Sequence, residues 1–374
     1  MDICSPTNTV SLSNFDVLKF DAVEDPLIDV TKLTTVDFEE SYFATTVNFI
    51  MENRNEYTKA KMTLYKSISE ATSERVVLES FSDFFVKIKE IIDKFLKFLK
   101  SLAARFLTSL NKLIESESYL KKHKKDFSDF KDADKFDITG YKFTFTDNIP
   151  VPNAILDFNR DMFIDLLGDQ NKINASGVQS TNVYLAANLE NKCNEFRKNI
   201  IGADNDISIS DFPDELFKVY RNGDSDTDTI EIDRLYVKNA VDRFFSYSTI
   251  KKSIDSQCKQ VNDAYKRVEA QVKDIVKRNG DLNKEAFKTN MQKATDITAV
   301  SVDGEGIMMS GDLMMQLDIY VKTKVDEIQK CSDIHALAFS AKLDALKDCY
   351  RQDKATLYTA LSRIQRTDAK RKDG

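Results

Sequence analysis

The chain has 374 residues, of which 42% are hydrophobic and 31% charged, enough to bury the core of two or three domains. Its 10 glycines and 5 prolines allow few tight turns, and its 25 phenylalanines favour long helices with one apolar face. A net charge of −7 argues against a protein that binds nucleic acid over its whole surface, and five widely spaced cysteines without a CxxC pair argue against a disulfide framework.

Residues 1–35 are predicted to form an extended acidic arm, because Pro6, Pro26 and scattered apolar residues give no helical period. Residues 1–56 hold eleven acidic groups against three basic ones, so this part carries −8 and the rest of the chain +1. The first residues lack the basic start and apolar run of a secretion signal, and no stretch approaches about 18 uncharged apolar residues. We therefore expect neither secretion nor a transmembrane segment.

Residues 36–120 are predicted to be an N-terminal helical region with a Phe-rich amphipathic helix over 81–114. A second apolar row lies beside the main one, which makes the face wider than a two-stranded coiled-coil seam and favours a bundle. The same helix carries a net charge of +4, which leaves a helix lying in a membrane interface as an alternative. The main row, spaced alternately by four and three residues, is the predicted core or partner face: Phe81, Phe85, Ile88, Ile92, Phe95, Leu99, Leu102 and Phe106.

Residues 121–136 alternate Lys and Asp and are predicted to be a charged linker. The next segment, 137–232, is predicted to be a mixed, mainly helical domain. Alternating aromatic and polar residues after Tyr141 predict one small β element near residues 139–148. Helices are expected at about 154–167, 180–200 and 211–221, between glycines and prolines.

An acidic turn at 222–229 is similar to a calcium loop, but its spacing does not fit. Counting from Asp224, Thr229 occupies the sixth position, where glycine is needed, and Leu235 the twelfth, where a bidentate Glu is needed. We predict no structural metal there. A long helix is expected to follow and to end at Asn279-Gly280. Residues 233–374 are predicted to form a long-helix hairpin or bundle.

Little in the sequence points to catalysis. Only His123 and His335 are present, and neither glycine-rich phosphate-binding motif occurs. We identify no catalytic, metal or cofactor-binding residue, no cofactor and no small-molecule substrate, and expect no nucleic acid partner. A divalent-metal-dependent enzyme stays open as a second alternative. The fold class is mainly α, with long amphipathic helices in bundle or hairpin packing.

The absence of Trp, the many Lys, Asp, Asn, Ile and Phe residues and the Phe-rich helix resemble virion structural proteins of large tailed bacteriophages. In T-even-like phages the prohead protease cuts after an apolar residue, any residue and Glu, ahead of a small residue. Ile68-Ser69-Glu70-Ala71 has this form, as does Leu113-Ile114-Glu115-Ser116. The resemblance implies a non-enzymatic head or tail component, assembled in the host cytoplasm through contacts with other structural proteins and its own copies. It also implies a possible processing site at Glu70 and Ala71 and a removable segment of residues 1–70.

Overall fold

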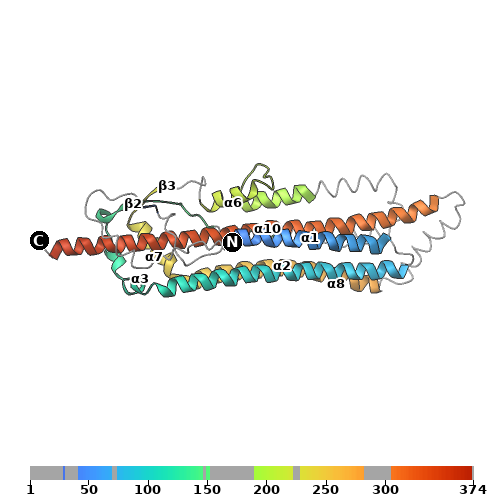
Figure 1. Cartoon of the computed structure of the whole chain (residues 1–374), viewed down its shortest axis with the longest axis horizontal. Helices are drawn as coiled ribbons and strands as arrows, with labels where there is room; N and C mark the ends of the chain where they lie inside the picture. The colour runs from blue at the N-terminus through green and yellow to red at the C-terminus, as the bar shows by residue number, and fades with distance from the viewer. Residues whose placement is uncertain are drawn as a thin grey trace, which may run out of the picture.

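Four long helices run along the length of an elongated bundle (Figure 1). They are α1 (Tyr42–Ser69), α2 (Glu74–Ser116), α8 (Tyr247–Asp281) and α10 (Glu305–Lys372). The computed structural model describes residues 28–29, 41–69, 74–145, 149–151, 189–221, 228–281 and 305–372. The mainly α fold class predicted from the sequence is confirmed.

Helix α2 buries its apolar row against the other long helices. Ile88, Ile92, Phe95, Leu99, Leu102 and Phe106 are all 2% exposed or less. The side chains of Phe81 and Phe85 lie outside the described residues. Lys87, Lys89 and Lys94 are exposed beside this row, and Lys94 and Lys89 contact Glu56 of α1 and Glu269 of α8. Each buried large side chain contributes about 1.5 to 3 kcal/mol, so this row is a principal source of stability.

The two C-terminal long helices, predicted to form a hairpin or bundle, each pack chiefly against an N-terminal helix. Within the described residues, α8 packs chiefly against α2, and α10 packs against α1. A cavity of about 180 Å³ is lined by residues of both helices, and elsewhere the Tyr265 hydroxyl of α8 lies within hydrogen-bond distance, 2.8 Å, of the Ser332 hydroxyl of α10. The expected continuous helix is also interrupted: α7 (Arg234–Phe245) ends at Phe245, and α8 begins at Tyr247 after the single residue Ser246.

A small sheet lies towards the end of the bundle where the chain terminates (Figure 1). Strand β2 (Phe136–Gly140) pairs antiparallel with β3 (Asp228–Ile232), and β1 (Ile28–Asp29) adds to β2 in parallel. The predicted β element near 139–148 is therefore displaced towards the N-terminus. After Gly140, residues 141–145 belong to no helix or strand.

Residues 121–136 are a packed segment, in contrast to the predicted solvated linker. They include the end of α3 (Ser118–Lys122) and two 3₁₀ turns, η3 (Asp126–Asp129) and η4 (Asp132–Asp134). Phe127 and Phe130 are buried between the charged residues. Two aromatic side chains within a charged run thus anchor the segment to the core.

Shorter helices cover the side of α10. One spans 189–201, and α6 (Phe212–Tyr220) begins after Asp211 with Pro213 in its first turn, as predicted. The helix predicted at about 154–167 lies outside the described residues. Helix α10 is enclosed by α1, α2, α6 and α7, which makes it the central helix of the fold.

Candidate functional site: the polar contacts of the central helix

Helix α10 is buried on nearly every side from Val325 to Leu361, yet it carries many charged residues. Asp344, Lys347, Asp353 and Lys354 are each at most 8% exposed. A buried charge strongly destabilises a fold unless it is paired and hydrogen-bonded. The partners of these groups therefore determine what this part of the molecule can do.

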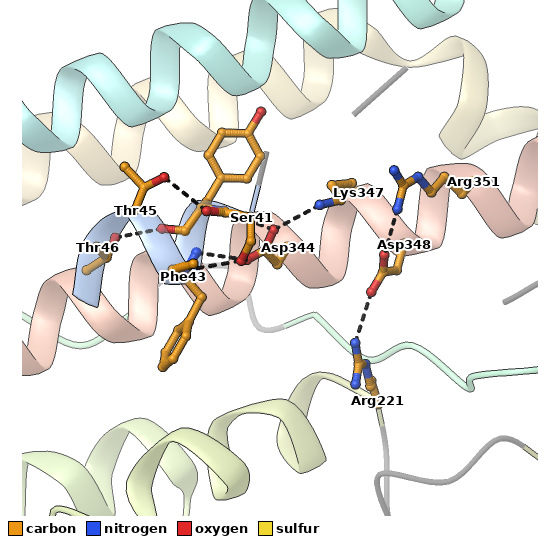
Figure 2. Close-up of polar contacts among 11 residues, drawn as sticks. Ser41, Phe43, Thr45, Thr46, Arg221, Asp344, Lys347, Asp348 and Arg351 are labelled. Carbon is orange, nitrogen blue, oxygen red and sulfur yellow. Dashed lines mark hydrogen bonds and ion pairs between the residues drawn. The ribbon is translucent and has the colours of Figure 1, made fainter. Parts of the chain in front are cut away.

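Asp344 caps the N-terminus of α1, about 300 residues earlier in the chain. Its carboxylate accepts hydrogen bonds from the backbone N–H of Tyr42 at 3.2 Å and of Phe43 at 2.8 Å, and from the Ser41 hydroxyl at 3.1 Å (Figure 2). The Ser41 hydroxyl in turn accepts from the N–H of Ala44 at 3.2 Å. The first N–H groups of a helix have no hydrogen-bond partner within the helix. A carboxylate at this end also interacts favourably with the positive end of the helix dipole. This contact fixes where α1 begins on α10.

One turn further along α10, Asp348 connects the helix to the end of α6. Arg221 donates to Asp348 at 2.9 Å, and Arg351 lies 3.6 Å from the same carboxylate (Figure 2). The Arg221 guanidinium also lies over the rings of Tyr141 and Phe217, at 4.4 and 5.0 Å from their centroids. The Arg221–Asp348 ion pair is partly exposed, so it stabilises the fold less than the cap of α1 does.

Asp353 receives a bidentate contact from Arg243 of α7, with distances of 2.9 and 2.7 Å. Burial raises the pKa of Asp353, and the hydrogen bonds from Arg243 oppose that rise. Next to it, Lys354 contacts Glu117 at the end of α2 at 2.6 Å, and the Tyr358 hydroxyl donates to the same carboxylate. Two adjacent charges on α10 thus bind two different helices.

Two buried glutamines attach the chain after β2. The Gln352 side chain accepts from the N–H of Tyr141 and donates to its C=O, both at 2.9 Å. Gln257 of α8 does the same for Ile149, at 2.8 and 3.1 Å. A side-chain amide that accepts from the N–H and donates to the C=O of one residue satisfies both backbone groups, as a neighbouring strand would in a sheet. The two glutamines thus hold Tyr141 and Ile149 in place although neither residue belongs to a sheet.

Another polar cluster joins α10 to the helix at 189–201. Glu190 contacts Arg197 at 2.9 Å and Lys330 of α10 at 3.0 Å, and these hydrogen bonds lower the pKa of the Glu190 carboxyl. Arg197 also donates to the carbonyl of Ile207 at 2.9 Å. The charged groups are again paired with residues of a neighbouring element.

The histidines and cysteines do not form a reactive constellation in the described residues. His335 is fully buried beside Phe196, and neither ring nitrogen has a hydrogen-bond partner among the residues that the structure describes; burial lowers its pKa to about 4. His123 lies 2.6 Å from Asp126 near the surface. Burial raises the pKa of the Cys193 and Cys258 thiols to about 11, which disfavours the nucleophilic thiolate. Across the described ranges, no three His, Cys, Asp or Glu side chains are arranged to hold a metal ion.

The residues proposed from the sequence as sites fall in two groups. The described members of the α2 row lie together in the core, whereas Glu70, Ala71 and residues 222–227 of the acidic turn lie outside the described residues. Asp344, Gln352, Asp353 and Gln257 were not predicted from the sequence. The only local signal was a charged run, Lys347-Asp348 and Asp353-Lys354, in a helix that also carries apolar residues on several faces.

Comparison with protein-family models, with curated proteins and with solved structures finds no match to this chain. Among the helices that the structure describes, none combines the length and apolar character needed to cross a membrane.

Proposed function

We propose that the chain is a structural or assembly protein that acts through protein–protein contacts and not through catalysis. The observation that carries this proposal is the use of the polar groups on α10. Asp344, Asp348, Gln352, Asp353 and Lys354 each bind a different neighbouring segment. Such contacts position helices, and they occupy groups that an active site would need to keep available.

The elongated form and the sequence resemblance support a more specific proposal, a component of a bacteriophage head or tail. A long bundle presents extended helix faces, which suits repeated contacts with other structural proteins or further copies of the chain. The acidic arm over residues 1–35 supplies apolar side chains that a partner surface can bury. A virion location and these partners remain part of the proposal.

The membrane-acting alternative requires α2 to expose its apolar row. In the described part of α2 this row is buried, with Ile88, Leu102 and Phe106 almost inaccessible to solvent. Releasing the row would expose several large side chains to water, at a free-energy cost of about 1.5 to 3 kcal/mol each. The structure therefore favours the bundle role for this helix.

Sedimentation velocity of the full chain over a wide concentration range tests the proposal. We expect the weight-average sedimentation coefficient to rise with concentration, because association follows mass action. Co-sedimentation with anionic and neutral vesicles runs in parallel. A chain that stays monomeric throughout and binds the vesicles would contradict the assembly function and support the membrane-acting one. A melting temperature that rises on addition of Mg²⁺ or Mn²⁺ would instead revive the enzyme alternative.

A further inference from the structure

A cavity of about 370 Å³ opens between α1, α2 and α10, away from the polar contacts described above. Its volume is in the range of pockets that hold small organic molecules. Phe49, Ile91 and Phe95 provide an apolar wall. Polar and charged residues complete the lining: Asn53, Glu56, Lys59, Lys87, Glu90, Lys94, Ser332 and Asp333.

Most charges around the cavity are neutralised by neighbours. Lys87 lies 2.6 Å from Glu90, and Lys94 lies 2.5 Å from Glu56. Lys59 also has an interaction partner. The cavity therefore has no unopposed cluster of cations that would attract an anionic ligand.

Two polar side chains of the lining are left without a hydrogen-bond partner among the described residues. Asn53 is only 7% exposed, and its amide has no partner within the described part of the chain. Asp333 is likewise without a hydrogen bond or ion pair there, and burial raises its pKa to about 7, a rise that the charge of Arg54 opposes. Asp333 is half-buried and Asn53 buried, and neither has a fully enclosed polar atom without a partner, so the polar atoms of both can be reached by a donor bound in the cavity.

We propose that this cavity binds a small organic cation, with its ammonium on Asp333 and Asn53 and its apolar body against Phe49, Ile91 and Phe95. An ammonium provides three donors and a positive charge, which match one carboxylate and one amide oxygen. The phenylalanine rings add a favourable surface for a cation with an aromatic or aliphatic body. Glu56 and Glu90 are paired with lysines, and Asp333 alone supplies too few oxygens for a divalent metal. A purely apolar ligand would leave the Asp333 and Asn53 side chains desolvated.

The positive charge of Arg54 competes with a bound cation for the Asp333 carboxylate. Arg54 lies on the exposed side of α1, and its charge acts on the Asp333 carboxyl without a direct contact. Removing this charge should strengthen binding of a cation. The other charged groups around the site are Glu56 and Lys59 from α1 and Lys87, Glu90 and Lys94 from α2.

Isothermal titration calorimetry of the full chain with tryptamine tests the proposal, with tryptophol as the uncharged analogue. We expect saturable binding of tryptamine that is about tenfold tighter than binding of tryptophol. Asp333→Asn should abolish the preference for the amine, and Arg54→Gln should tighten tryptamine binding a few-fold. Asp129→Asn, the same change at an exposed site at the far end of the bundle, should have no effect.

A second readout concerns protons. Because Asp333 is partly protonated near neutral pH, tryptamine binding at pH 7 should release protons, and its enthalpy should depend on the ionisation enthalpy of the buffer. Absence of tryptamine binding at about 5 mM, equal affinity for tryptophol, or unchanged binding by Asp333→Asn would each overturn the proposal. Arg54→Gln lies on the surface, so it keeps the test valid if Asp333→Asn does not fold. None of these outcomes depends on whether the chain assembles.

Discussion

Replacement of Asp344 by Ala tests the most specific contact of the fold, the cap that α10 places on α1. The substitution removes the acceptor for the N–H groups of Tyr42 and Phe43 and for the Ser41 hydroxyl. Tyr42 is 2% exposed, so water cannot easily replace the lost acceptor there. Each buried donor left unpaired costs about 1 to 3 kcal/mol, so we expect the free energy of unfolding to fall by about 2 to 4 kcal/mol. For a chain of this length, that corresponds to a decrease in Tm of about 3 to 5 °C.

Urea unfolding gives the total loss, and hydrogen exchange shows where it occurs. The amides at the start of α1 should lose protection by a larger factor than those of α8, because the cap acts locally. Asp348→Ala is the matched control on the same helix. Among the described residues its carboxylate pairs with the partly exposed Arg221 and Arg351, so its loss should cost about 1 kcal/mol or less. If Asp344→Ala cost no more than Asp348→Ala, or if exchange in α1 were unchanged, the capping argument would be refuted.

Three further predictions concern the core. Phe95→Ala should lower the free energy of unfolding by about 3 to 5 kcal/mol, since Phe95 is 2% exposed and packs on Tyr265; a loss below about 1 kcal/mol in denaturant unfolding would contradict its core role. Gln257→Leu should cost about 2 to 4 kcal/mol, because it leaves both backbone groups of Ile149 unpaired, whereas Gln260→Leu one turn away should cost much less in the same assay. His335 has a folded-state pKa of about 4 against an ordinary value of 6.5, so the unfolded chain binds the proton more readily between these values. Stability that depends on His335 is thus present above about pH 6.5 and is lost, by about 3 kcal/mol, as the pH falls through 4. His335→Phe should lack this loss when unfolding is compared at pH 7 and pH 4.5, and an equal loss in both proteins would show that His335 is not the group responsible.

The local part of the fold was predictable because it depends on local periodicity. The alternating row in α2 indicated a buried helix face, and the helix predicted at about 211–221 corresponds to α6. The pairing of helices was not predictable, because α2, α8 and α10 all have apolar faces that fit several partners. Strand β3 was missed since its five residues follow an acidic stretch and bury only Ile230 and Ile232.

The candidate site could not be predicted from the sequence, because its contacts, like the pairing of the helices, join residues that are far apart in the chain. Asp344 finds its partners about 300 residues earlier in the chain, and Gln352 binds a segment 211 residues away. A side chain that caps a helix or bridges two segments has no periodic pattern in the sequence. A charged residue on a helix is therefore predicted to be solvent-exposed unless the positions of the neighbouring elements are known. Only the tertiary arrangement identifies Asp344 and Gln352 as interior groups.

Quantitative mass spectrometry of gradient-purified phage particles, taken from cells that express this chain, tests the proposed virion role most directly. The account predicts that peptides of the chain band with intact particles in a fixed ratio to the major structural proteins, and that this ratio survives a high-salt wash. Peptides spanning Glu70 and Ala71 would also show whether that bond is cut in the particle. A chain found only in the unsedimented fraction, at no fixed ratio to any particle, would contradict the account.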